Sequence, residues 1–197
     1  MYARLNYVGM KPELMEELKP FWRARVEEFS GVEKGYFLLE EGNHAWTLSV
    51  VLFENKAAMD SNTHNSLGAV AQRAARFRTT EPDLHPREVL AHLPGHAGEV
   101  GYARVADVEL RVDSVDEASA TWPSQVEAYL DEKGFRHAYF CGDRKTGKIA
   151  SISFWGSKAD AEANEASGAF AAAMEPHEAL MTAKPKVSHW DVVVVVG

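Results

Sequence analysis

The hydrophobic and polar positions along the chain follow one pattern twice. Residues 35–59 alternate as a strand, a polar turn containing glycine, a second strand and the start of a helix, and residues 138–161 repeat this succession. The match extends outward, because YARLNYVG near the N-terminus corresponds to YARVADVE at residues 102–109. A repeat of this length, covering nearly the whole chain, predicts two copies of one domain rather than a solenoid.

Each copy is expected to begin with a strand followed by an amphipathic helix. In the first copy, Pro12 suits the first helical turn and Gly31 is a typical helix stop. Pro20 interrupts the apolar stripe between them and should kink the helix or divide it in two. Pro123 stands at the same distance before Gly134 as Pro20 stands before Gly31, so the two prolines are taken as equivalent.

The order strand, helix, strand, strand, helix, strand identifies each copy as a ferredoxin-like β-α-β-β-α-β unit of the α+β class. A linker is predicted at 94–98, which gives repeats at residues 1–95 and 99–197. Such a unit leaves one sheet face uncovered, so we expect the two repeats to pack sheet to sheet. The C-terminal run of five valines fits this arrangement, because a strand without polar alternation should be buried on both sides.

Composition excludes several classes of partner. The net charge of −8 argues against nucleic acid, which requires a positive surface. The N-terminus lacks the pattern of a signal peptide, and the valine run is too short to span a bilayer. Cys141 is the only cysteine, so no intrachain disulfide can form. We therefore expect a cytoplasmic protein that binds neither nucleic acid nor membrane.

Several positions in both copies carry a resemblance to a known family. They are a glycine, an aromatic residue, a second aromatic residue and an Asn/Ser-Lys helix start: Gly31, Phe37, Phe53, Asn55, Lys56 and Met59, and again Gly134, Phe140, Trp155, Ser157, Lys158 and Ala161. The pattern resembles the dimeric α+β barrel superfamily, and within it the antibiotic-biosynthesis-monooxygenase group. The resemblance implies a fused pair forming an intrachain dimeric α+β barrel. It leaves function open, because the superfamily includes cofactor-free oxygenases, haem-degrading enzymes, isomerases and domains without known chemistry.

Two polar residues of the first copy are candidate catalytic groups. Asn6 lies within the first strand, where it either occupies a strand edge or donates a hydrogen bond into a pocket between sheet and helices. His64 lies on the helix after the paired strands, either on a solvated face or over the same pocket. The expected substrate-binding residues are Trp22, Phe37, Trp46, Phe53 and Arg76. The remaining histidines show no metal-ligand spacing, so no metal is expected.

The haem-degrading members of the superfamily combine a strand Asn, a hairpin Trp and a helical His. The first copy has Asn6 and His64 but Phe53 in place of the Trp, whereas the second has Trp155 but Ala106 in place of the Asn. Because neither copy is complete, no cofactor is expected.

The function predicted from the resemblance is a cofactor-independent, monooxygenase-like enzyme acting on a small aromatic or polyketide-like substrate, with the working site in the first copy. The alternatives are a non-catalytic module that binds a small hydrophobic ligand and a haem-binding module of the same fold. The expected partner is a small molecule, and a homodimer of the fused chain is left open.

Overall fold

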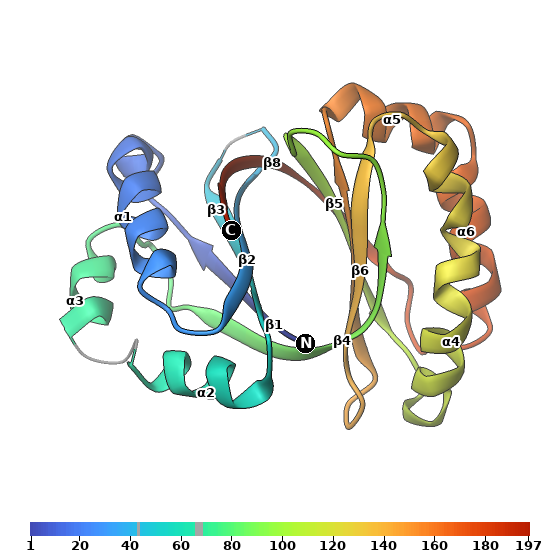
Figure 1. Cartoon of the computed structure of the whole chain (residues 1–197), viewed down its shortest axis with the longest axis horizontal. Helices are drawn as coiled ribbons and strands as arrows, with labels where there is room; N and C mark the ends of the chain where they lie inside the picture. Colours follow the sequence, from blue (N-terminus) through green and yellow to red (C-terminus); the bar gives the residue numbers. More distant parts are fainter. Residues whose placement is uncertain (43, 66–68) are drawn as a thin grey trace. The chain divides into compact units, whose positions relative to one another are not determined.

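The computed structural model describes residues 1–42, 44–65 and 69–197, without the side chains of residues 64, 65 and 69–71. It divides into two compact units (Figure 1). The first comprises Met1–Arg87 together with Val192–Gly197, and the second comprises Glu88–Asp191. Within the described ranges, no helix is long and apolar enough to cross a membrane.

The two halves of the chain contain the same succession of elements. The first half contains β1 (Tyr2–Gly9), the 3₁₀ helix η1 (Pro12–Leu14), α1 (Met15–Glu27), β2 (Val32–Glu40), β3 (Trp46–Phe53), α2 (Lys56–Asn65), α3 (Ala69–Ala75) and β4 (Asp83–Pro94). The second half contains β5 (Tyr102–Glu109), η2 (Val112–Ser114), α4 (Val115–Gln125), η3 (Glu127–Asp131), β6 (Phe135–Asp143), β7 (Lys148–Trp155), α5 (Lys158–Ala166), α6 (Ala169–Glu178) and β8 (Lys186–Val196). The predicted α+β class and the tandem ferredoxin-like order are confirmed.

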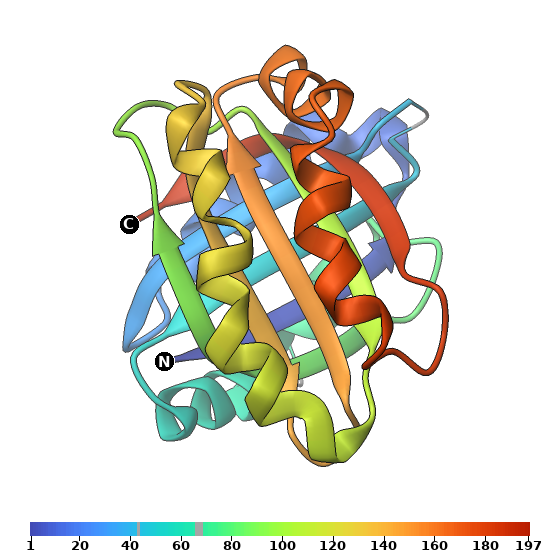
Figure 2. The same cartoon turned by 90° about the vertical axis from the view of Figure 1, so that its right-hand side faces the viewer.

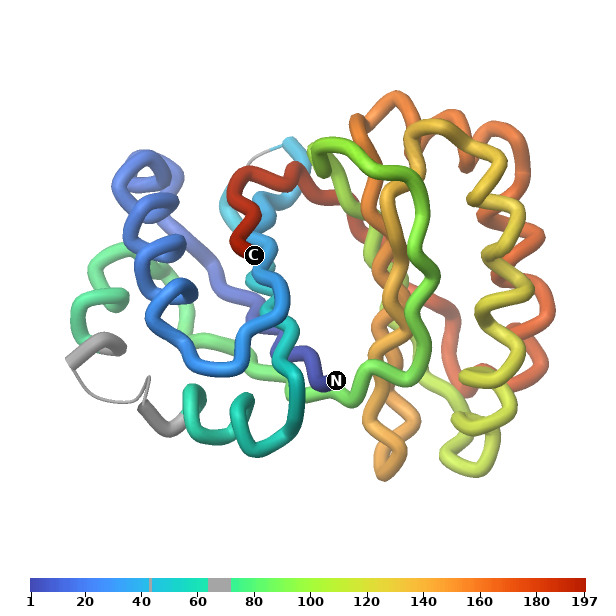
Figure 3. The backbone as a smooth tube through the Cα atoms, viewed as in Figure 1, coloured from blue at the N-terminus to red at the C-terminus, as the bar shows by residue number. Residues whose placement is uncertain are grey.

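The eight strands are antiparallel where their register is defined and hydrogen-bond in the closed order β1-β3-β2-β8-β5-β7-β6-β4. The last strand of each half is long, and the unit boundaries at Arg87 and Asp191 fall inside β4 and β8. Figure 3 traces β8 in dark red to the C-terminus, where its last residues belong to the first unit beside β2. The C-terminal strand is therefore part of the sheet of both units.

In the second unit, α4 and α6 lie side by side across one face of the sheet (Figure 2). Successive strand residues point to opposite faces, so one face of β5 presents Tyr102, Ala106 and Val108 to these helices. Trp122 and Val126 of α4 fill the same core. The opposite face of β5 carries a second, separate set of side chains.

The predicted consequence of Pro20 is wrong in part, because α1 is one helix that runs through it. Pro20 is the sixth residue of α1, beyond the first four N–H groups that have no helical partner, so the helix continues past it with one backbone hydrogen bond missing. Pro123 lies instead two residues before the end of α4. Since α1 begins at Met15 and α4 at Val115, the two prolines occupy different helical positions. The extra residues of the second half form η3, after the helix.

The C-terminal valine run is less buried than its composition predicts. Val194 is 6% exposed and packs against Phe37, Leu39 and Phe77 of the first unit. The other four valines are half-buried. Burial on both sides therefore describes the middle of the run only.

Candidate functional site

A cavity lies inside the second unit, between the helix-covered face of the sheet and helices α4 and α6. Its walls are mostly apolar and aromatic, and its volume is about 20 Å³. The lining side chains are Arg104, Ala106, Val108, Leu110, Trp122, Val126, Tyr129, Ala138, Phe140, Ser151, Ser153, Phe170, Ala173, Met174, His177 and Met181. This volume accommodates about one water molecule, so a larger ligand must displace side chains on entering. Phe170, Met174 and Met181 are only partly buried, and methionine side chains adapt readily.

The spacing of residues along α6 explains how a histidine reaches this cavity. Phe170, Ala173, Met174 and His177 follow the i, i+3, i+4, i+7 pattern that places side chains on one helical face. That face packs on the sheet, so His177 is 4% exposed and its ring stacks on Phe140 with centroids 6.0 Å apart.

The imidazole of His177 is buried without hydrogen bonds. Both Nδ1 and Nε2 lack a partner among the residues that the structure describes. Burial lowers the pKa of His177 below its usual value, so the ring is neutral at pH 7. A buried histidine with a purely structural role normally has a hydrogen-bond partner, since an unpaired buried polar group costs about 1–3 kcal/mol. His177 therefore has both nitrogens available to a ligand.

Arg104 is the second polar group of the cavity. It extends from β5 and is 2% exposed. Its guanidinium carbon lies 3.9 Å from the centroid of the Phe170 ring and 5.5 Å from that of Trp155. Its Nη2 donates to Asn164 Oδ1 at 2.7 Å and to the hydroxyl of Tyr129 at 3.4 Å. Burial raises the pKa of Tyr129 to about 12 despite the opposing effect of Arg104, so the phenol keeps its proton.

The charge of Arg104 is compensated by Glu165 on α5. Arg104 Nη1 lies 3.2 Å from Glu165 Oε1, and the same oxygen is 2.8 Å from His189 Nε2. Burial alone would raise the pKa of Glu165, but hydrogen bonds from His189 and Arg104 outweigh it and lower the net pKa. The carboxylate is therefore ionised at neutral pH, and the Arg104–Glu165 pair is close to neutral as a unit.

The first unit contains the same framework. Trp22 donates its indole N–H to Ser49 Oγ at 2.9 Å and stacks on Phe37, just as Trp122 donates to Ser151 Oγ at 3.1 Å. Arg4 occupies the position of Arg104, because it lies at the same place in the repeated Tyr-Ala-Arg sequence. The two arginines even contact equivalent aromatic residues, since Arg4 lies 5.4 Å from the ring centroid of Phe53 and Arg104 lies 5.5 Å from that of Trp155.

Four predicted site residues lie on this framework in the first unit. Asn6 is on β1 opposite Ser49 of β3, and its Oδ1 is buried without a partner among the described residues. Phe37 and Phe53 are buried, and Trp22 is stacked on Phe37 at 5.2 Å between centroids. In the second unit, Ala106 takes the place of Asn6 opposite Ser151.

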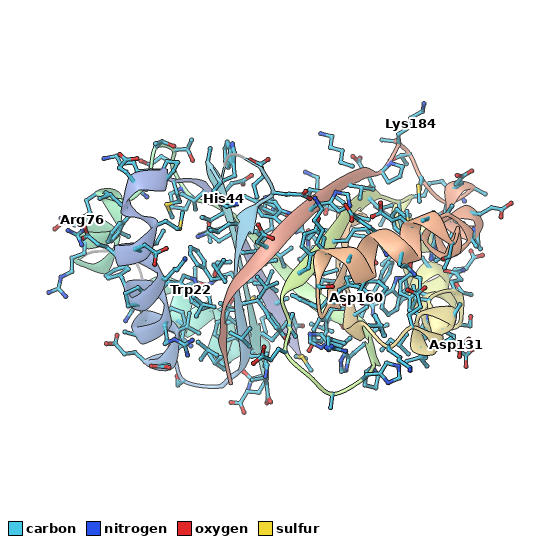
Figure 4. The ribbon with its side chains drawn as sticks, turned by 90° about the horizontal axis from the view of Figure 1, so that it is seen from above. Trp22, His44, Arg76, Asp131, Asp160 and Lys184 are labelled. Carbon is cyan, nitrogen blue, oxygen red and sulfur yellow. The ribbon has the colours of Figure 1, made fainter. Side chains whose placement is uncertain are left out.

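The other predicted site residues lie elsewhere. Trp46 begins β3 and is 40% exposed, at the opposite end of that strand from Phe53. Arg76 pairs with Glu17 at 2.9 Å, and its side chain extends from the outer edge of the first unit (Figure 4). His64 lies in α2, but its side chain is outside the described part of the structure. The catalytic assignment to Asn6 and His64 stays a prediction.

Sequence reasoning overlooked Arg4, Arg104 and His177. The signal for the arginines was present in the repeat, because both copies place an arginine third in a strand that begins Tyr-Ala. The signal for His177 was its helical spacing from Phe170, Ala173 and Met174. No group of three His, Cys, Asp or Glu side chains suited to a metal ion occurs among the described residues.

Comparison with known proteins identifies the fold. No protein-family model matches the chain, and no curated protein sequence is significantly similar to it. A candidate monooxygenase from Fusobacterium nucleatum is 12% identical with a TM-score of 0.77, covering 98% of this chain and 93% of its own. An anthrone oxidase-like protein is 17% identical with a TM-score of 0.74, covering 99% and 92%. A haem-degrading enzyme from Listeria monocytogenes is 9% identical with a TM-score of 0.57, covering 96% and 99%. At these identities the likeness concerns the fold, which is the one that the sequence resemblance implied.

Proposed function

We propose that the chain is a cofactor-independent, monooxygenase-like enzyme that oxidises a small aromatic or polyketide-like substrate in the cavity of the second unit. The observation that carries this proposal is the neutral, unpartnered imidazole of His177 inside an aromatic-walled cavity. A neutral imidazole has a nitrogen lone pair that can accept a proton, which is the role of a general base. The name of the anthrone oxidase-like relative indicates a substrate class that gives a stabilised carbanion on losing one proton.

The chemistry requires one base and groups that stabilise negative charge. His177 takes a proton from the methylene carbon of an anthrone-type substrate, and the electron pair left behind delocalises onto the oxygen of the ketone carbonyl. Tyr129 keeps its proton and lines the cavity, so its hydroxyl can donate to that oxygen while accepting from Arg104. The carbanion then reduces dioxygen directly. The methylene becomes a carbonyl, one oxygen atom enters the product, and the other leaves as water with the two protons.

The aromatic walls hold the ring system and exclude water. Trp122, Phe140 and Phe170 supply flat apolar surfaces. Because the volume is about 20 Å³, a substrate of several fused rings must open the cavity by moving Met174 and Met181 at its partly exposed side. A closed aromatic enclosure around the carbanion protects it from reprotonation by water.

Haem, suggested by the name of the haem-degrading relative, does not fit the residues present. In the second unit, which holds the cavity and His177, Ala106 stands opposite Ser151, whereas the first unit has Asn6 at the equivalent position opposite Ser49. The residue set expected for haem degradation is also divided between the two copies, with Asn6 in one and Trp155 in the other. No step of the proposed reaction involves haem.

Oxygen uptake tests the proposal. Wild-type protein is expected to consume oxygen with anthrone as substrate, and His177→Ala should lower the rate about 10²–10⁴-fold, the range for removal of a general base. His96→Ala is the matched control, because His96 is exposed and lies outside the cavity. Tight binding of anthrone without oxygen uptake would instead support the alternative function, a non-catalytic module for small hydrophobic ligands.

A further inference from the structure

The two equivalent arginines, Arg104 buried and Arg4 partly buried, differ in one respect that suggests a second binding site. Arg104 is paired with Glu165, but the corresponding contact of Arg4 is Thr63, whose Oγ1 accepts from Arg4 Nη1 at 3.1 Å. No carboxylate lies within ion-pair distance of Arg4 among the described residues. The residues outside that description, 43 and 64–71, include no Asp or Glu. Arg4 is therefore a largely buried cation without an anionic partner from its own chain.

A second cation increases the positive potential at this place. The guanidinium carbons of Arg4 and Arg25 each lie 4.9 Å from the centroid of the Phe29 ring. Burial, and secondarily the charge of Arg25, lower the pKa of Arg4 to about 10, so Arg4 remains protonated at neutral pH. Arg25 also pairs with Glu28 at 2.7 Å, whereas Arg4 has no such compensation. A buried charge of this kind is unfavourable unless an anion is supplied.

An unsatisfied acceptor lies beside this cation. Asn6 follows Arg4 by two residues on β1, so both side chains leave the same sheet face, from backbone positions about 7 Å apart along the strand. Its Oδ1 is buried and has no hydrogen-bond donor among the described residues. Phe29 and Phe53 contact Arg4 through their ring faces. Together these groups offer a cation, an acceptor and aromatic surfaces.

We propose that the first unit binds a small hydroxylated aromatic acid, with the carboxylate on Arg4 and the hydroxyl hydrogen donated to Asn6 Oδ1. A ring that carries a carboxylate and a hydroxyl has one substituent for each of the two groups, and its faces can pack against Phe29 and Phe53. The proposal does not depend on oxidation in the second unit, because none of its residues lines that cavity. The chain would then use its two copies differently, one for a neutral aromatic substrate and one for an aromatic anion.

Calorimetric titration with 4-hydroxybenzoate tests the site on the intact chain. Arg4→Met should weaken binding at least tenfold, and the uncharged methyl ester should bind the wild type at least tenfold more weakly than the acid. Arg23→Met is the matched control, because it also removes one positive charge from the first unit but lies exposed beside Glu27. Asn6→Ala should weaken the binding of 4-hydroxybenzoate but leave the binding of benzoate, which lacks the hydroxyl, unchanged.

The second copy supplies a further variant that does not remove the arginine. Thr63→Glu would place beside Arg4 the carboxylate that Glu165 places beside Arg104, and it should abolish binding of the acid even if Arg4→Met fails to fold. Ala173→Val narrows the cavity of the second unit with a much smaller increase in volume and should leave binding unchanged. The proposal is overturned if the wild type does not bind the acid at millimolar concentration, if acid and ester bind equally, or if a folded Ala173→Val variant rather than Thr63→Glu loses binding.

Discussion

Replacing Arg104 and Arg4 in turn by methionine should have very different effects on stability. Methionine keeps much of the length and apolar volume of arginine but removes the charge and the hydrogen bonds. At Arg104 the change removes the hydrogen bonds that its guanidinium donates to Asn164 Oδ1 and to Glu165. Hydrogen bonds that involve a charged group contribute about 1.5–3 kcal/mol each, and Glu165, with its side chain 36% exposed, retains His189 and water. We therefore expect Arg104→Met to lower the free energy of unfolding by about 2–4 kcal/mol.

At Arg4 the same substitution removes one hydrogen bond to the hydroxyl of Thr63. That hydroxyl still donates to the carbonyl oxygen of Met59 at 2.9 Å, so no buried group is left unpaired. The loss of about 1 kcal/mol is offset by removal of an uncompensated charge, and the net change should lie within about 1 kcal/mol of zero.

Urea unfolding followed by circular dichroism measures both changes, with equal m-values required for the comparison. If Arg4→Met proved as destabilising as Arg104→Met, the difference in charge compensation between the two copies would be refuted.

Three further predictions concern the core, the titration of a histidine and the folding of one repeat. Trp155→Ala should lower stability by about 3–5 kcal/mol, because Trp155 is 0% exposed, and a smaller loss in urea unfolding would contradict its place in the core. Because burial lowers the pKa of His177, the unfolded chain binds a proton more readily, so stability should fall as the pH drops below about 6.5. His177→Phe should lose less stability than the wild type between neutral and mildly acidic pH. If the free energies of unfolding of the two proteins instead changed equally with pH, His177 would not be desolvated. The fragment 1–97 should aggregate or self-associate, because it lacks Val192–Val196 of its own unit, and a stable monomer in ultracentrifugation would disprove this.

The fold could be predicted from the sequence because its evidence is repeated. Strand alternation, turn glycines and helix starts occur in both halves, so each element is supported twice. The helix register could not be deduced, because aligning Pro20 with Pro123 by distance from the next glycine ignored the extra turn formed by Glu127–Asp131. The partners of β4 and β8 also lay beyond prediction, since strand length alone does not say which neighbours a strand pairs with.

The candidate site was predicted less well than the fold. Aromatic residues on the helix-facing side of the first unit follow from the pattern, and Asn6 has the unpaired oxygen that a pocket residue would have. The cavity itself lies in the second unit and depends on Ala106 and Ala173, whose small side chains leave space. Empty volume is a property of how side chains pack, and no single residue type in the sequence indicates it. Its polar groups, Arg104 and His177, were not predicted to line a cavity, because arginine and histidine are usually exposed.

The most direct test of the proposed function is the fate of oxygen during turnover of anthrone. In an atmosphere of isotopically heavy dioxygen, the wild type should give anthraquinone with one heavy atom in its new carbonyl, and consume one dioxygen per product. His177→Ala should form this product about 10²–10⁴-fold more slowly, whereas His96→Ala should match the wild type. Labelled product formed equally fast by His177→Ala, or lost instead in Asn6→Ala, would contradict assignment of the oxidation to the cavity of the second unit.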